Sequence, residues 1–255
     1  MKVFAMSKKG SDPEKTACED SILFRIISKH GYISSVIWGS SFELEIPYGD
    51  ECLAAVSDGI GESNAGEVAS RFILNNLAKT HFPAELSRDR IIAEIKSINE
   101  HLIRYSQQDK VLSSMGATLS GIIAGYNGAW LFHTGNSRVY VTNGGFLRQL
   151  TNDHTRSFGK PWRKRDSRIL SCMGGGKQEH LDMLQVTEIL QYLPEAGTSG
   201  KIVFTTDGIH DHMENEDLED LLSQSRDDVS FSSRAMELAL KNDSDDDMSI
   251  MIITP

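Results

Sequence analysis

The sequence predicts an α+β fold, a four-layer α-β-β-α sandwich in which two stacked, mainly antiparallel sheets are flanked by helix pairs. In the middle of the chain, short apolar runs are joined by turns of a few residues, too short for the crossovers that parallel strands need. Two pairs of helices interrupt and follow the strands, and each helix of the first pair has one apolar stripe to cover a sheet. Because no repeat or linker divides the 255 residues, we expect residues 1–255 to form a single domain.

The first half of the chain begins with strand patterns and continues with helical ones. Ile22–Phe24 and Leu53–Val56 are continuous apolar runs typical of buried strands, and the second run stops abruptly at Ser57–Gly59. From Ser63 the apolar spacing changes to that of a helix. Its apolar positions are Ala65, Val68, Ala69, Phe72, Ile73 and Leu77. A second amphipathic helix follows the Pro83 breaker, with apolar positions at Ile91, Ile95, Ile98, Leu102 and Ile103.

The second half contains an antiparallel meander. Its expected strands are Ala117–Ala124, Ala129–Thr134, Val139–Thr142 and Phe146–Leu150. Asn-Gly pairs at two of the turns between them favour tight hairpins. Residues 153–168 are polar and basic without a clear period, which predicts a mobile loop or flap. The remaining expected elements are a strand at 202–205, helices near 215–223 and 232–240, and a final strand at 249–253.

Composition is that of an ordinary globular protein, with 39% hydrophobic and 24% charged residues. A net charge of −10 argues against nucleic acid or a membrane surface as a partner. No stretch has the pattern of a signal peptide or approaches the roughly 20 apolar residues of a membrane span, so we expect a cytoplasmic protein. Cys18, Cys52 and Cys172 are isolated, which favours buried or half-buried thiols over a disulfide or zinc site.

Acidic residues stand at the ends of four expected strands. They are Asp20 before 22–24, Asp58 after 53–56, Asp207 after 202–205 and Asp246 before 249–253. An Asp-Gly pair after a single strand is usually a turn, but the same pair after two buried strands favours a shared site. Converging carboxylates repel one another unless cations neutralise them, and all-oxygen ligands are typical of Mg²⁺ or Mn²⁺. Gly59 permits close backbone approach, so its carbonyl is a further candidate ligand.

These residues lie in motifs that resemble the metal-dependent protein phosphatases of type 2C, especially their compact bacterial members. Ser57–Gly61 and Asn64–Ser70 are similar to the family's DGxGG motif and its following helix, and Glu19-Asp20 is similar to the opening NED. The other matches are 116–118 with GST/GAT, 135–140 with GDSRxY, 150–155 with LTxDHS, 206–211 with SDGLxD, and 246–250 with DNxTv. The motifs occur in family order over residues 19 to 250, so the resemblance covers nearly the whole chain.

The resemblance implies a catalytic domain over 1–255 that hydrolyses phosphoserine and phosphothreonine in proteins, with a metal-bridging water attacking phosphorus. It implies two Mn²⁺ or Mg²⁺ ions bridged by Asp58, with the Gly59 carbonyl on one of them. The implied ligands of the second ion are Asp207 and Asp246, with Asp20 and Glu19 contributing directly or through water. The expected partners are phosphorylated protein substrates and an opposing serine/threonine kinase, and we expect a monomer.

Several residues depart from the family pattern. Lys15 is the nearest basic counterpart of the arginine that grips substrate phosphate, so the candidate catalytic residues are Asp58, Asp207 and Lys15. Asn136 replaces the aspartate of GDSR that is linked in bacterial relatives to a third ion. A third site is therefore doubtful, and its remaining candidate ligands are Asp207 and Asp211. The other departures are Cys18 for an asparagine, Glu62 for the second glycine of DGxGG, and Asp247 for the asparagine of DN.

These departures motivate an alternative, a catalytically weak or inactive member of the fold that acts as a phosphoprotein-binding regulatory module. A metal-stabilised structural domain is a third possibility, although it leaves the ordered motifs unexplained.

Three further motifs of known binding sites are incomplete in this sequence. The pair His210 and His212 lacks the Asp-His that zinc hydrolases of this pattern need, so we expect surface histidines there. Residues 243–254 lack the glycine and glutamate of an EF-hand, and 174–177 lack a P-loop's flanking residues.

Overall fold

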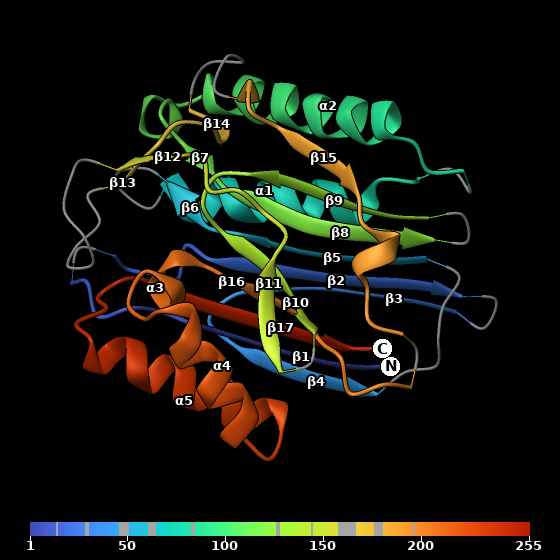
Figure 1. The fold of residues 1–255 in the computed structure, drawn as a ribbon. Coiled ribbons are helices and arrows are strands. Elements are labelled where there is room, and N and C mark those ends of the chain that lie inside the picture. The colour runs from blue at the N-terminus through green and yellow to red at the C-terminus, as the bar shows by residue number, and fades with distance from the viewer. Residues whose placement is uncertain are drawn as a thin grey trace.

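The computed structural model describes residues 1–13, 15–28, 31–45, 51–60, 65–82, 85–125, 128–143, 145–157, 167–175, 181–195 and 197–255. It is a sandwich of two six-stranded sheets with helices on both outer faces (Figure 1). The predicted α+β class and the antiparallel stacking of two sheets are confirmed. No helix in the described ranges is long and apolar enough to cross a membrane.

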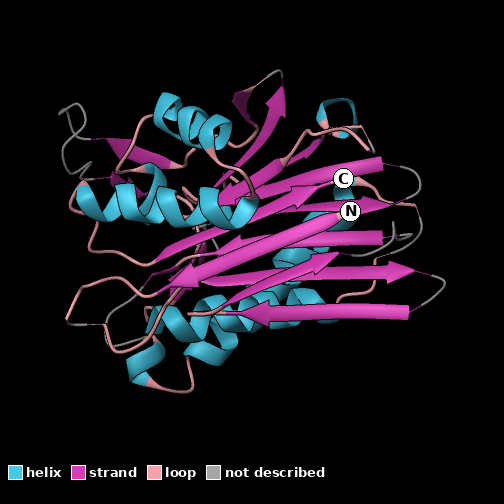
Figure 2. Cartoon of the chain, turned by 90° about the horizontal axis from the view of Figure 1, so that it is seen from below, coloured by secondary structure: helices cyan, strands magenta, loops and turns pink. Residues whose placement is uncertain are grey.

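The first sheet contains both ends of the chain. Its order is β11 (Phe146–Gln149), β10 (Arg138–Asn143), β16 (Ile202–Thr205), β17 (Met248–Thr254), β1 (Lys2–Lys8) and β4 (Ser41–Glu45). Every pairing is antiparallel. Lys2 lies opposite Thr254, so the termini are adjacent, as Figure 2 shows.

The second sheet contains most of the meander. Its order is β15 (Gln185–Glu188), β9 (Gly128–Thr134), β8 (Leu119–Gly125), β5 (Glu51–Ser57), β2 (Ser21–Ser28) and β3 (Gly31–Ile37). All of these pairings are antiparallel as well. β10 and β11 continue the meander along the chain but pair in the first sheet, so the meander passes from one layer to the other.

Two long helices cover the second sheet and three shorter helices cover the first (Figure 1). α1 (Ala65–Lys79) and α2 (Arg88–Ser106) bury the apolar stripes that the helical spacing predicts. Ser87 begins α2 as an N-cap, since its side chain accepts from the Arg90 backbone N–H. The helices on the first sheet are α3 (Asp207–His210), α4 (Asn215–Gln224) and α5 (Asp228–Lys241).

The core consists of three apolar layers. Side chains from both sheets, including Phe24, Val56 and Phe204, form the layer between the sheets. A second layer lies under α1 and α2, and a third lies under α4 and α5. The layers of α1 with α2 and of α4 with α5, outside the two sheets, are therefore the four-layer arrangement that the sequence predicts, and the short α3 is an addition to it.

Short elements add detail that the sequence does not predict. β6 (Gly59–Ile60), β7 (Gly116–Ala117) and β14 (Met173–Gly174) form a small sheet beside α1. The expected flap begins and ends in a hairpin of β12 (Thr155–Ser157) and β13 (Ser167–Ile169). Its middle, 158–166, lies outside the described residues, as does Glu62. The late helices and the last strand agree with the predicted ranges, whereas β1, β3 and β4 were not predicted.

Candidate metal centre

Strand pairing within each sheet brings the predicted carboxylates into two pairs. Ser21 lies opposite Ser57, so Asp20, before β2, is next to Asp58, after β5. Thr205 lies opposite Ile250, and this pairing places Asp207, the first residue of α3, near the residues that precede β17. Asp246 is among those residues.

Thr206 joins the two pairs across the sheets. Its Oγ1 donates to Asp20 Oδ2 at 2.8 Å and accepts from the Ser249 backbone N–H at 2.9 Å. One hydroxyl therefore connects the loop before β2 with the ends of β16 and β17. The sequence reasoning missed Thr206, although its position directly before the Asp-Gly pair was a signal that it belongs to this site.

The carboxylates lie close to one another, two of them buried and two, Asp207 and Asp246, half-buried. Asp20 is fully buried and Asp58 is 7% exposed. Burial raises the pKa of Asp58, and the neighbouring charges of Asp207 and Asp20 raise it further. Burial also raises the pKa of Asp20, with a further contribution from Asp247. For Asp207, burial followed by the charges of Asp246 and Asp211 raises the pKa to about 6. Such a cluster is electrostatically unfavourable without cations.

Several oxygens of the cluster have no hydrogen-bond partner among the described residues. They are Asp20 Oδ1, Asp207 Oδ1 and Asn136 Oδ1. Buried acceptors of this kind are rare in folded proteins and require an explanation. Hard oxygen donors with free lone pairs are the ligands that Mg²⁺ and Mn²⁺ take, so the donor set fits the divalent cations that the sequence implies.

The backbone around Gly59 is closely packed. A Cβ on Gly59 would lie 2.3 Å from the carbonyl carbon and oxygen of Gly66 in α1, so neither glycine tolerates a side chain without movement. The Asp58 carbonyl accepts from the Thr118 N–H at 2.8 Å, and Thr118 Oγ1 accepts from the Asp58 N–H at 2.9 Å. The loop that carries the proposed bridging carboxylate is thus held on both sides. Thr118, which holds this loop in place, is a second residue of the site that the sequence reasoning missed.

Lys15 and Glu19 lie against the other end of the cluster. Lys15 Nζ is 2.6 Å from Asp246 Oδ1, 3.1 Å from Glu19 Oε2 and 3.7 Å from Asp247 Oδ2. In the part of the chain that the structure describes, no three His, Cys, Asp or Glu side chains are already disposed around one common ion position. The cation within the cluster is instead the Lys15 ammonium.

Asn136 and Asp211 both neighbour Asp207. Asn136 Nδ2 donates to Asp207 Oδ2 at 2.8 Å, and the Asp211 N–H donates to the Asp207 carbonyl at 2.9 Å. The structure therefore brings together all the predicted site residues around two carboxylate pairs. Whether each one binds a metal remains a prediction.

The expectation of surface histidines after Asp207 is wrong for one of the two. His210 is 2% exposed, and its Nδ1 lies 2.7 Å from Thr205 Oγ1. It is buried because α3 places it against Thr205, the last residue of β16. His212 Nδ1 instead lies 3.1 Å from the Asn242 carbonyl, so the two imidazoles have different neighbours.

Cys18 is buried, as expected, and burial raises the pKa of its thiol to about 12, which argues against a nucleophilic role.

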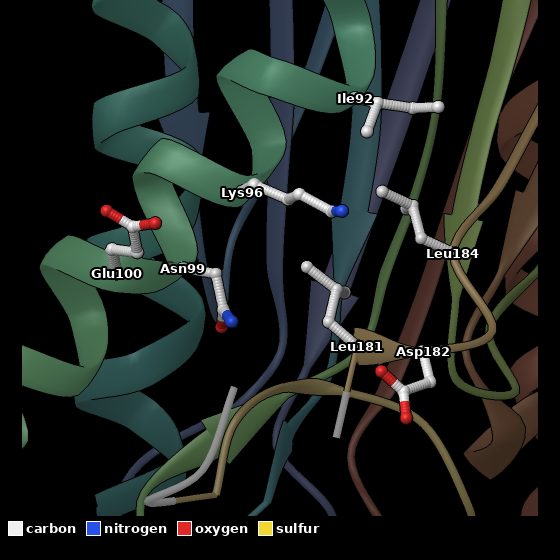
Figure 3. Close-up of a pocket in the computed structure, with 7 residues that line it drawn as sticks. All are labelled: Ile92, Lys96, Asn99, Glu100, Leu181, Asp182 and Leu184. Atoms are coloured by element: carbon white, nitrogen blue, oxygen red, sulfur yellow. The ribbon is translucent and has the colours of Figure 1, made fainter. Parts of the chain in front are cut away.

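A separate hollow of about 410 Å³ lies between α2 and the segment before β15 (Figure 3). Lys96 points into it from α2. Its described lining residues are Ile92, Lys96, Asn99, Glu100, Leu181, Asp182 and Leu184. None of the proposed metal ligands is among them, so the candidate chemistry lies elsewhere.

The fold and the site together define an α-β-β-α protein with a buried acidic centre suited to hard divalent cations. The family model described as protein phosphatase 2C matches residues 42–242, and the chain belongs to that family. Phosphatases of this family are metal-dependent.

Two bacterial phosphatases illustrate the sequence similarity. The serine/threonine phosphatase Stp of Listeria welshimeri is 30% identical over 109 residues, 40% of this chain and 43% of the relative. The serine/threonine protein phosphatase PstP of Mycobacterium tuberculosis is 25% identical over 221 residues, 80% of this chain. That match spans 40% of PstP, so the matched regions cover about two fifths of the relatives' own length.

Solved structures show the same fold. The M. tuberculosis PstP/Ppp crystal structure superposes with a TM-score of 0.72 at 22% identity, covering 99% of this chain and 98% of the other. The Streptococcus agalactiae serine/threonine phosphatase gives 0.73 at 19% identity, again covering 99% and 98%. The predicted family resemblance is confirmed by the family match.

Proposed function

We propose that this chain is a protein serine/threonine phosphatase that hydrolyses phosphoserine and phosphothreonine esters with the help of two divalent cations, Mn²⁺ or Mg²⁺. The observation that carries the proposal is the cluster of Asp20, Asp58 and Asp207. Asp20 and Asp58 are buried, and Asp20 and Asp207 each have a buried carboxylate oxygen without a partner among the described residues. Family membership and the names of the relatives support the same activity.

Each residue has a defined task in this proposal. Asp58 is in electrostatic reach of both Asp20 and Asp207, so we assign it the bridging position. Asp246 and Asp207 would hold the second ion, with Glu19 and Asp20 beside them and the Gly59 carbonyl on the first. When bound, the ions supply positive charge for the phosphate oxygens and lower the pKa of ligated water.

Lys15 would bind the substrate phosphate. As a single ammonium it supplies charge without the bidentate geometry of arginine. Since this interaction is shared by ground and transition states, Lys15→Ala should raise KM more than it lowers kcat. Unchanged kinetic constants would show that another residue binds the phosphate.

The activity is tested with the purified chain and a phosphothreonine peptide. We expect phosphate release with Mn²⁺ or Mg²⁺, none with EDTA, and loss of turnover in Asp58→Asn with an unchanged far-UV spectrum. Asp220→Asn, an exposed acidic position on α4, is the matched control and should keep full turnover. No metal-stimulated turnover across a broad pH range would leave a phosphoprotein-binding module as the better account, although the comparisons give that alternative no support. Size-exclusion chromatography tests the proposed monomer.

A further inference from the structure

Lys15 is held among carboxylates rather than exposed beside them. Its side chain is 22% exposed, and its Nζ is within 4 Å of Asp246, Glu19 and Asp247. A lysine side chain is positively charged at neutral pH, so these distances place an ammonium inside the acidic centre.

Asp247 holds the segment that carries Lys15. Its carboxylate is 1% exposed, with Oδ1 accepting from the Gly10 N–H and Oδ2 from the Glu19 N–H, both at 2.7 Å. The Asp12 N–H also donates to the Asp245 carbonyl at 3.1 Å. Residues 10–19 are thus anchored at both ends to the residues before β17, because one buried carboxylate accepts from the first and the last of them.

Close backbone contact leaves this segment little freedom. A Cβ on Gly10 would lie 2.2 Å from the Asp245 carbonyl oxygen and 2.4 Å from the Asp246 carbonyl oxygen. The segment that carries Lys15 therefore lies directly on the residue proposed as a ligand of the second metal. Lys15 reaches Asp246 from this fixed base through its four-carbon stem.

We propose that the Lys15 ammonium is a tethered counter-ion of the second metal's ligands, and that a divalent cation displaces it from Asp246 when it binds. The inference rests on the metal site of the proposed function. An ammonium 2.6 Å from Asp246 Oδ1 and a dication on the same oxygen, at a distance of about 2.1 Å, would repel each other strongly. The displaced ammonium would then be available to the substrate phosphate, so metal binding and phosphate binding by Lys15 are coupled.

Metal affinity gives the first test. Lys15→Met keeps the apolar stem but removes the competing charge. Lys9→Met is the matched control, because Lys9 directly precedes this segment and its Nζ donates to the backbone carbonyls of Gly10 and Asp12 instead of to a carboxylate. In calorimetric titrations with Mn²⁺, K15M should bind the ion on the order of tenfold more tightly than wild type, and K9M within about twofold of it. Equal or weaker binding by K15M than by K9M would overturn the proposal.

Chemical modification of the wild-type chain gives the second test and does not depend on a variant folding. Brief acetylation is followed by mass spectrometry, with Lys9 as the internal reference. Adding Mn²⁺ to EDTA-treated protein should raise the acetylation of Lys15 several-fold relative to Lys9. Unchanged or reduced Lys15 acetylation while Mn²⁺ binds would refute the displacement. If wild type and K15M both fail to bind Mn²⁺, the metal site of the proposed function is wrong, and the displacement falls with it.

Discussion

Asp207 illustrates a conflict between stability and proposed function at the scale of single residues. It lies beside Asp58 and Asp246, and its charge is desolvated by burial. A group of like charges in such a place destabilises the folded chain unless a cation is present. The carboxylates proposed to bind metal therefore lower the stability of the metal-free fold.

Asp207→Asn should stabilise the metal-free protein while abolishing turnover. The amide removes one negative charge from the cluster and can still accept from Asn136 Nδ2 through its carbonyl oxygen. In EDTA we expect the free energy of unfolding to rise by roughly 1–3 kcal/mol, measured by denaturant titration. Asp220→Asn serves as the exposed control. A variant less stable than wild type in EDTA would contradict this account of the cluster.

Asn136→Asp should create a stronger site for a third ion. The asparagine is 2% exposed and donates to Asp207, so the substitution replaces a donor with a second carboxylate. Hard cations prefer charged oxygen ligands, so we expect higher activity at low metal concentration and an additional anomalous peak in crystals soaked in Mn²⁺. A fully occupied third ion ligated by Asn136 in the wild type would show that the lost charge matters little.

His133 should make the stability of the fold depend on pH. It is fully buried, with Nε2–H donating to the Asn152 carbonyl at 2.9 Å and Ser120 Oγ 2.8 Å from Nδ1. Burial, followed by the neighbouring His154, lowers its pKa from 6.5 to about 4. The unfolded chain therefore binds the proton first as pH falls, and stability present above pH 6.5 is lost toward pH 4.

The comparison with His133→Gln isolates this effect, because every other ionisable side chain is the same in both proteins. The stability advantage of wild type over the variant should shrink by at most about 3 kcal/mol between pH 7 and pH 4. Urea titrations at several pH values measure it. An advantage independent of pH would mean that His133 is not a neutral buried residue.

At the scale of elements, the contact between α1 and β6 positions the proposed first metal site. Gly59 and Gly66 touch through their backbones, and a Cβ on Gly66 would also lie 2.8 Å from Glu19 Oε1. The helix therefore lies directly behind the Gly59 carbonyl and the Glu19 carboxylate. The small size of both glycines sets this geometry, which the amphipathic pattern of α1 does not reveal.

Gly66→Ala should displace α1 from β6. The added methyl has to move backbone, so we expect a loss of stability of about 2 kcal/mol and weaker Mn²⁺ binding. Thermal unfolding and calorimetry measure the two effects. Asn75→Ala, on the exposed side of the same helix, should change neither by much. If Gly66→Ala binds Mn²⁺ as wild type does, the close contact does not shape the site.

At the scale of the whole molecule, the sandwich depends on the layer between the sheets. Phe24 and Phe204 are fully buried there and come from different sheets. The first and the last strand of the chain, β1 and β17, pair with each other in the interior of the first sheet. These shared contacts support our proposal that residues 1–255 form one folding unit.

Phe24→Ala should destabilise both sheets together. A cavity of this kind costs about 3–5 kcal/mol, and the loss should appear equally in far-UV circular dichroism and tryptophan fluorescence. Phe146→Ala, at a 69% exposed position, is the control and should change stability little. Two separate transitions in the wild type would show that the chain contains two units.

Much of the architecture could be predicted because periodicity is a local signal. A few neighbouring residues are enough to show which face of an element is apolar and will be buried. This holds for the helical stripes from Ala65 and from Ile91 and for the buried run at 53–56. β1 and β4 were missed because their pairing with β17 and with each other brings together distant parts of the chain. The short strands β6, β7 and β14 have too few residues for any period.

The sequence by itself determined the fold class, the family and the acidic residues at the strand ends, because these depend on residue type and spacing along the chain. Only the tertiary structure decided which of these charges meet. In the folded chain Thr206 bonds to both Asp20 and Ser249, and His210 is buried. Asp247 anchors the segment from which Lys15 contacts Asp246. Such contacts join residues up to 237 positions apart, and their geometry follows from strand pairing and backbone contact rather than from any local pattern.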